Sequence, residues 1–222
     1  MLHPCTHPLF DLHWGFSTRA ESPVFLPSPL LSQVHGTKVL EAADRLQEGD
    51  GIWTMEPGRL IGVRVADCTP ILLAGLIQGQ PWVAALHAGW RGAIGGPGTP
   101  GILRVALQVF RDLGGQPRDL HWALGPALQA CHFEVGEEVL EAARCDPAWR
   151  EDFAAPGPRG RPHLDLARVI RAQALDLGLD PAKDGSISRC TLCERDLFFS
   201  YRGGDLKERQ WGWVLIASAR QR

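Results

Sequence analysis

Three short segments of the chain each place a strong metal ligand beside an apolar stretch. The ligands are His35 in Gln-Val-His-Gly, Cys68 in Ala-Asp-Cys-Thr-Pro, and His87 in His-Ala-Gly-Trp-Arg-Gly. Their separations of 33 and 19 residues differ from the tight Cys-x-x-Cys knuckles of a structural zinc finger. Three ligands from separate segments are typical of a catalytic zinc site with an open fourth position. Spacing alone is weak support, since a single histidine or cysteine is more often a packed core residue.

The residues around these ligands strengthen the metal-site hypothesis. Gly36, Gly89 and Gly92 remove side chains beside the ligands and so allow the backbone to approach them closely. Trp90 offers a stacking face, and Arg91 offers a fork for phosphate or carboxylate. Core packing of Trp90 and a surface ion pair of Arg91 are equal alternatives.

The sequence predicts a mixed α/β domain whose strand ends position these segments. Apolar runs predict strands at residues 60–66, 71–77, 82–86, 120–124 and 211–217, and helical periodicity predicts helices at 102–113, 135–144 and 166–177. Thr99 and Pro100 suit the N-cap and first turn of the first of these helices. The stretch 154–162, rich in proline and glycine, is typical of an exposed loop.

The composition limits the possible functions. The 23 Lys and Arg residues against 25 Asp and Glu residues give a net charge of −2, which argues against a nucleic-acid partner. No stretch approaches the ~18 apolar residues of a membrane span, and the first five residues lack a secretory signal pattern. Six cysteines in 222 residues suit reduced thiols or metal ligands better than a disulfide scaffold. We therefore expect a single cytoplasmic domain over residues 1–222 with no membrane partner.

Further motifs resemble one known family in the same order along nearly the whole chain. Besides the three ligand segments they are Gly-Phe-Ser-Thr-Arg at 15–19, Asp-Gly-Ile-Trp-Thr at 50–54, Gly-Pro at 125–126, Phe-Glu-Val-Gly at 133–136, Cys-Thr-Leu-Cys at 190–193 and Phe-Phe-Ser-Tyr-Arg at 198–202. The chain resembles the bacterial YfiH/YlmD-like family, also called the polyphenol oxidoreductase or laccase-domain family and related to human FAMIN. The resemblance implies an αββα layered fold with mixed β-sheets and Zn²⁺ on His35, Cys68 and His87. It also implies purine nucleoside phosphorylase activity on adenosine, inosine and S-methyl-5′-thioadenosine, with an adenosine deaminase side activity.

Candidate substrate-binding residues follow from this activity. Phosphorolysis needs phosphate held against the ribose C1′, and Arg19, Arg91 and Arg202 are candidate forks because guanidinium matches phosphate in a bidentate manner. Gln33 and Phe199, from the matching motifs, and Trp90 complete the candidate substrate-binding residues. For deamination, zinc would lower the pKa of bound water to about 7 and supply hydroxide for attack at purine C6.

Two further residues are candidates for the catalytic machinery. Asp67, beside Cys68, is either an orienting group or general acid or, as an alternative, a cap of the tight turn before Thr69. Cys131 either lines the pocket as a thiol or fourth ligand, or is a buried inert thiol. Cys190 and Cys193 form a lone Cys-x-x-Cys, a weak metal signal, and two structural thiols are the preferred interpretation.

Three other functions remain open. Two histidines and a cysteine also suit copper (Cu²⁺) and hence a polyphenol oxidase, although the sequence contains no His-x-His pair. Zinc hydroxide would equally support a hydrolase that edits peptidoglycan precursors. A non-enzymatic, zinc-stabilised binding module is the third, because the segment after Arg19 is shorter than in relatives. The sequence leaves the oligomeric state open.

Overall fold

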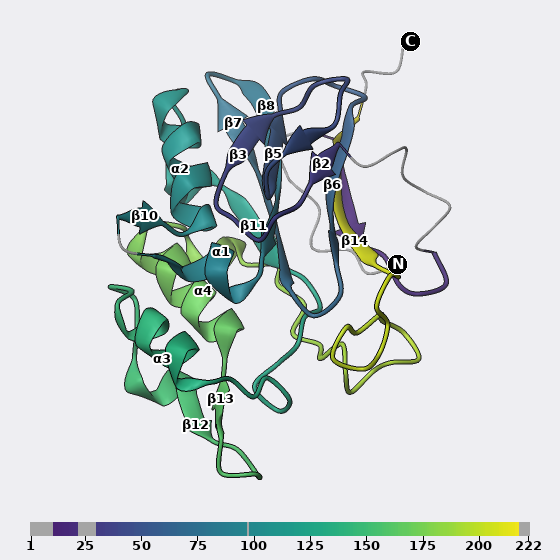
Figure 1. Ribbon diagram of the computed structural model, residues 1–222. Coiled ribbons are helices and arrows are strands. Elements are labelled where there is room, and N and C mark those ends of the chain that lie inside the picture. The colour runs from purple at the N-terminus through teal and green to yellow at the C-terminus, as the bar shows by residue number, and fades with distance from the viewer. Residues whose placement is uncertain (1–10, 22–29, 97, 218–222) are drawn as a thin grey trace.

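A five-stranded mixed sheet lies at the centre of the computed structural model, which describes residues 11–21, 30–96 and 98–217 (Figure 1). Its strand order is β11-β7-β8-β5-β3, and every neighbouring pair is antiparallel except β3 and β5. The strands are β3 (Val39–Glu41), β5 (Gly51–Thr54), β7 (Thr69–Ile77), β8 (Gln80–Ala88) and β11 (His121–Leu124). Gln78 and Gly79 join β7 to β8 with φ of 50° and 80°, as a two-residue hairpin turn requires.

A three-stranded antiparallel sheet covers one face of the central sheet. Its order is β1-β14-β6, with β1 at Leu12–Phe16, β6 at Leu60–Val65 and β14 at Gln210–Ile216. Residues that alternate along the strands of both sheets fill the space between them, as period-two side-chain geometry dictates. The core between the sheets includes Trp14, Phe16, Val63, Leu72, Val83 and Val214.

Helices cover the other face of the central sheet. They are α1 (Trp90–Ile94), α2 (Ile102–Asp112), α3 (Glu137–Arg144) and α4 (Leu166–Asp176), and all four contribute to one core with β7, β8 and β11. The buried side chains of α2 recur at helical spacing and lie against this sheet; they are Ile102, Leu103, Ala106, Leu107 and Phe110. β7 is buried almost throughout because it is covered on both faces.

The mixed α/β class and the principal predicted elements are confirmed, with two local corrections. Thr99 and Pro100 are not the N-cap and first turn of α2, because this helix begins at Ile102 and Gly101 is its N-cap. Thr99–Pro100 forms strand β10, which pairs with β9 (Gly95–Gly96). The stretch 154–162 is not simply a loop, because Ala154–Pro156 (β12) and Pro162–Leu164 (β13) pair as a hairpin.

The remaining elements are short. They are the parallel strands β2 (Leu31–Ser32) and β4 (Gln47–Glu48), and the 3-10 turns Pro117–Asp119, Glu151–Phe153 and Pro181–Lys183. Within the described ranges, every helix is too short or too polar to cross a bilayer.

Candidate active site and metal centre

His35, Cys68 and His87 come together although they lie on three different segments. Their potential ligand atoms all lie within 4.8 Å of one another, and the two imidazole rings meet edge to face with centroids 4.7 Å apart. The β7–β8 register pairs Pro70 with His87, so Cys68, two residues before Pro70, lies beside the end of β8. His35 follows β2, in a loop that folds back over this strand end.

Asp50 fixes two of the three ligands. Its carboxylate accepts hydrogen bonds from the backbone N–H groups of Val34 (3.2 Å), His35 (2.9 Å) and Gly36 (2.8 Å). The same carboxylate lies 2.7 Å from Nδ1 of His87, so Nδ1 carries the proton of that ring and Nε2 is left to bind a metal. Asp50 is completely buried. It therefore holds the His35 loop and orients the His87 ring at once.

Without a metal, the electrostatics of the cluster favour a thiolate at Cys68 and a proton on His87. Burial by itself would raise the pKa of the Cys68 thiol, but hydrogen bonds with His35 and His87 outweigh it and lower that pKa to about 7. Burial would lower the pKa of His87, yet its hydrogen bonds with Asp50 and Cys68 raise it to about 9. For Asp50, hydrogen bonds from His87 and from the N–H of Gly36 outweigh burial and hold its pKa below the usual value. Cys68 is thus held toward the thiolate, the form that binds metals.

Backbone conformation beside the ligands is unusual. His35 and Asp67 adopt positive φ, 59° and 82°, which costs energy in residues other than glycine and is common at functional sites. A Cβ on Gly89 would lie 3.1 Å from Cδ2 of His35 and 3.2 Å from Sγ of Cys68. Only glycine therefore lets the chain turn from β8 into α1 without displacing these ligands.

The three ligands open onto a cavity of about 650 Å³. Its charged lining among the described residues is mostly cationic: Arg64, Arg91, Arg202, Lys207 and Arg209 stand against the single carboxylate of Asp67. Apolar and aromatic side chains form the remaining walls; they include Leu128, Phe133, Leu166, Trp90 and Tyr201. This volume suits a small organic ligand, and the cationic lining suits an anionic one.

Besides the three candidate metal ligands, five of the predicted site residues line this cavity, and their polar groups differ in how many partners they already have. Arg91 stacks on Trp90 (4.3 Å from guanidinium carbon to ring centroid), and its guanidinium makes no hydrogen bond or ion pair within the described chain. Arg202 donates one long hydrogen bond of 3.3 Å, from its guanidinium to the carbonyl of Glu134. Gln33 uses both ends of its amide on the backbone of Arg64, at 2.8 Å each, and thereby ties the His35 loop to β6.

Asp67 also lines the cavity, but other loops occupy its carboxylate. One oxygen accepts the hydroxyl of Thr191 at 2.6 Å and the other accepts the N–H of Arg202 at 2.7 Å. Its backbone carbonyl accepts the N–H of Leu128 at 2.8 Å. Asp67 thus joins the Cys68 turn to two loops that form the cavity wall.

The structure does not bring Arg19, Phe199 or Cys131 into the cavity lining. Arg19 pairs with Asp205, donates to the carbonyls of Arg195 and Phe198, and stacks on Phe199 at 4.3 Å. Cys131 belongs to a second cluster of sulfur and nitrogen ligands. The shortened segment after Arg19 falls largely on residues 22–29, outside the described residues.

Several site residues were not singled out from the sequence. Asp50 belongs to a quoted motif, but its role depends on the loop that folds around it and carries no local signal. Arg64, Lys207 and Arg209 reach the cavity from β6 and from the segment before β14. Arg64 could have been noticed in the sequence, because it is the one charged residue in the otherwise apolar strand β6.

Comparison with known proteins identifies relatives of this chain. The family described as multi-copper polyphenol oxidoreductase laccase matches residues 19–217. A purine nucleoside phosphorylase from Deinococcus radiodurans is 37% identical over 195 residues, which cover 86% of this chain and 70% of that protein. Adenosine deaminase RL5, from an unknown prokaryotic organism, is 34% identical over 161 residues, covering 71% of this chain and 58% of that protein.

A solved structure supports the same relationship. The crystal structure of YfiH from Bacillus licheniformis matches with a TM-score of 0.76 at 26% identity, over 85% of this chain and 73% of that one. The match spans the layers described above and so agrees with the expected fold. The chain therefore belongs to the laccase-domain family that includes the YfiH and YlmD proteins.

Proposed function

We propose that this chain is a zinc-dependent purine nucleoside phosphorylase. Its substrates are adenosine, inosine and S-methyl-5′-thioadenosine together with phosphate, and its products are ribose 1-phosphate, or its 5-thiomethyl counterpart, and the free base. One observation carries the proposal: a single cavity combines two imidazoles and a thiol with a group of cationic side chains and aromatic walls. A relative named purine nucleoside phosphorylase supports this reaction, and one named adenosine deaminase supports the deaminase side activity.

The cationic side chains provide the phosphate site. Arg91 is the strongest candidate, because its guanidinium has no hydrogen-bond or ion-pair partner among the described residues and is already oriented by stacking on Trp90. Lys207 and Arg202 line the same cavity and would share the charge of the anion. Charge-assisted bonds to phosphate are about twice as strong as neutral hydrogen bonds, so these residues would hold phosphate for attack at C1′.

The aromatic and apolar walls provide the purine site. Trp90, Phe133 and Tyr201 present ring surface to the cavity, and base–aromatic stacking contributes about 1–3 kcal/mol per base. We assign Asp67 a positioning role, since both carboxylate oxygens are already hydrogen-bonded to loops of the wall. Gln33 has a similar role through the backbone of Arg64. Arg19, Phe199 and Cys131 would act, if at all, from outside the cavity.

His35, Cys68 and His87 would hold the metal. A soft thiolate with two imidazoles suits zinc and also copper, and three protein ligands leave a position for water or substrate. When bound there, zinc would act as a Lewis acid and supply a hydroxide-like water at neutral pH, which accounts for an adenosine deaminase side activity. Asp50 holds the proton on Nδ1 of His87 and so keeps Nε2 available. The described cysteines are free thiols, which favours a cytoplasmic location.

The test combines product analysis with metal analysis. Purified protein incubated with inosine and phosphate should release hypoxanthine and ribose 1-phosphate, and adenosine should in addition give some inosine. Cys68→Ala should lose the turnover and the metal bound at His35, Cys68 and His87, whereas Cys145→Ala, which changes an exposed thiol outside the cavity, should keep both. If the wild-type protein releases no base under conditions in which a known phosphorylase works, the proposal is wrong. Rapid turnover of a phenol with bound copper would instead favour the oxidase.

A further inference from the structure

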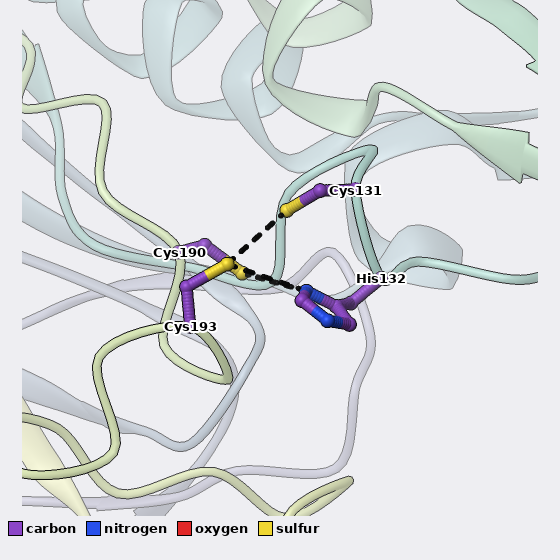
Figure 2. Close-up of side chains that lie close together, drawn as sticks. All are labelled: Cys131, His132, Cys190 and Cys193. Atoms are coloured by element: carbon purple, nitrogen blue, oxygen red, sulfur yellow. Dashed lines mark hydrogen bonds between the residues drawn. The ribbon is translucent and has the colours of Figure 1, made fainter.

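A second cluster of metal-ligand side chains lies outside the cavity lining. Cys131 and His132 come from the loop between β11 and α3, and Cys190 and Cys193 come from the segment between α4 and β14. Figure 2 shows the three sulfur atoms and the imidazole directed toward a common point from these two loops. All four ligand atoms lie within 4.8 Å of one another.

The separations within the cluster match the edges of a tetrahedral metal site. Sγ of Cys131 is 3.6 Å from Sγ of Cys193, and Nδ1 of His132 is 3.4 Å from Sγ of Cys193 and 3.7 Å from Sγ of Cys190. With zinc–sulfur bonds of about 2.3 Å, two sulfurs of a tetrahedron lie about 3.8 Å apart, and a sulfur–nitrogen edge is slightly shorter. A disulfide would instead need the sulfurs about 2.05 Å apart.

We propose that Cys131, His132, Cys190 and Cys193 bind a zinc ion of their own. Three thiolates and an imidazole select zinc over the hard cations magnesium and calcium. The set has four protein ligands, which is the closed coordination of a structural site and leaves no position for substrate. Cys131 and Cys193 are exposed while Cys190 is buried, so the ion could enter from solvent.

The backbone around the cluster is built to present these ligands. Ala127 and Cys190 form a parallel bridge: the N–H of Ala127 donates to Arg189 at 3.1 Å, and the N–H of Thr191 donates to Ala127 at 3.1 Å. The carbonyl of Cys190 accepts the N–H of Glu194 at 3.1 Å, which closes the turn that contains Cys193. The two loops are thus in register before any metal binds.

The ion would stabilise the wall of the cavity. The first loop supplies Leu128 and Phe133 to the lining, and the segment that continues from Cys193 supplies Tyr201 and Arg202. The same segment reaches the turn before Cys68 through Thr191 and Asp67. The four ligands come from loops about 60 residues apart in sequence and meet only in the folded chain, so the free energy of metal binding would add to the stability of the fold. The role is therefore structural, and the proposal does not depend on which reaction the cavity performs.

The direct test is the zinc content of purified full-length protein, measured by mass spectrometry of the metal. Wild type should contain about one equivalent more zinc than Cys193→Ser or His132→Ala, whatever the occupancy of the site at Cys68. Cys145→Ser, with an exposed thiol outside both clusters, should match wild type. His132→Cys preserves four ligands and should retain the equivalent that His132→Ala loses.

Two results would overturn the proposal. One is a Cys193→Ser variant with as much zinc as wild type. The other is wild-type protein isolated with a Cys131–Cys193 disulfide and no zinc beyond that which Cys68→Ala removes. Circular dichroism shows whether each variant still folds. If the bound metal stabilises the protein, His132→Cys should have the zinc content and thermal stability that His132→Ala lacks.

Discussion

Replacement of Asp50 by asparagine should disturb both folding and metal binding. In Asp50→Asn one carboxylate oxygen becomes an NH₂ group of nearly the same size. If NH₂ occupies the position of Oδ1, it faces the N–H of His35 and Nδ1 of His87; at the position of Oδ2, it faces the N–H groups of Val34 and Gly36. With the NH₂ group at the Oδ2 position, two backbone N–H groups face a donor and lose their hydrogen bonds. With the NH₂ group at the Oδ1 position, the N–H of His35 loses its hydrogen bond, and the His87 ring must accept at Nδ1 instead of donating.

The magnitude follows from burial. The carboxylate of Asp50 is completely buried, so water cannot replace a lost partner. Each buried group left without its partner costs about 1–3 kcal/mol. The two amide orientations leave one or two such groups, so we expect the free energy of unfolding of the metal-free protein to fall by about 1–6 kcal/mol. If His87 accepts at Nδ1, its proton moves to Nε2, the nitrogen left for a metal. Loss of such an orienting partner weakens metal binding about 10- to 100-fold.

Urea unfolding of metal-stripped protein measures the first effect, and competition with a chromophoric zinc chelator measures the second. Asp44→Asn is the matched control, because the Asp44 side chain is 89% exposed and its loss should change the free energy of unfolding by less than about 0.5 kcal/mol. If Asp50→Asn stays as close to wild type as this control and binds zinc equally well, the assigned role of Asp50 is wrong.

Three further predictions rest on single contacts. Gly89→Ala should weaken zinc binding in the same chelator assay, because the new Cβ would lie 3.1 Å and 3.2 Å from atoms of two metal ligands; unchanged affinity would contradict this. Arg91→Met should raise the KM for phosphate by about 10-fold or more by removing charge-assisted hydrogen bonds, whereas Arg19→Met should lower the melting temperature and leave that KM nearly unchanged. Hydrogen bonding from the N–H of Ser200, together with Arg19, holds the pKa of Asp205 below its usual value despite partial burial, so its ionised form stabilises the fold above about pH 4. Asp205→Asn should therefore lose roughly 1 kcal/mol or less at pH 7, and the difference from wild type in urea unfolding should shrink as the pH falls below 4.

Long elements with regular patterns could be predicted from the sequence. The apolar runs that form β7 and β8 and the periodic apolar positions of α2 and α4 encode their burial directly. The short elements could not. Helix α1 has five residues and the β12–β13 hairpin has three residues on each strand. Such lengths are not stable alone, so tertiary contacts that no local pattern encodes determine them.

The candidate metal ligands could be predicted from the sequence, but the residues that position them could not. The residue types and neighbours of His35, Cys68 and His87 pointed to a common site before any coordinates. The role of Asp50 depends on three consecutive N–H groups that converge only once the His35 loop folds back. The sequence predicts that Cys131 either lines the main pocket or is a buried inert thiol. It is instead an exposed thiol beside Cys193, a proximity that their separation in the sequence hides. Spacing within one segment is visible in a sequence, whereas the pairing of two distant loops is not.

Hydrogen-bonding capacity separates the predicted polar residues into two groups. Arg19 donates to Asp205 and to two backbone carbonyls, so phosphate could bind there only by breaking bonds that hold the loop. The side-chain polar atoms of Asp67 and Gln33 are likewise hydrogen-bonded to backbone and side-chain partners. The guanidinium of Arg91 has no hydrogen bond or ion pair within the described chain, and Arg91 lies on the cavity wall. A ligand binds most favourably to groups that need not release an existing partner. We therefore propose Arg91 as the main anion-binding residue of this cavity, with Asp67 holding the wall in place and Arg19 holding a neighbouring loop.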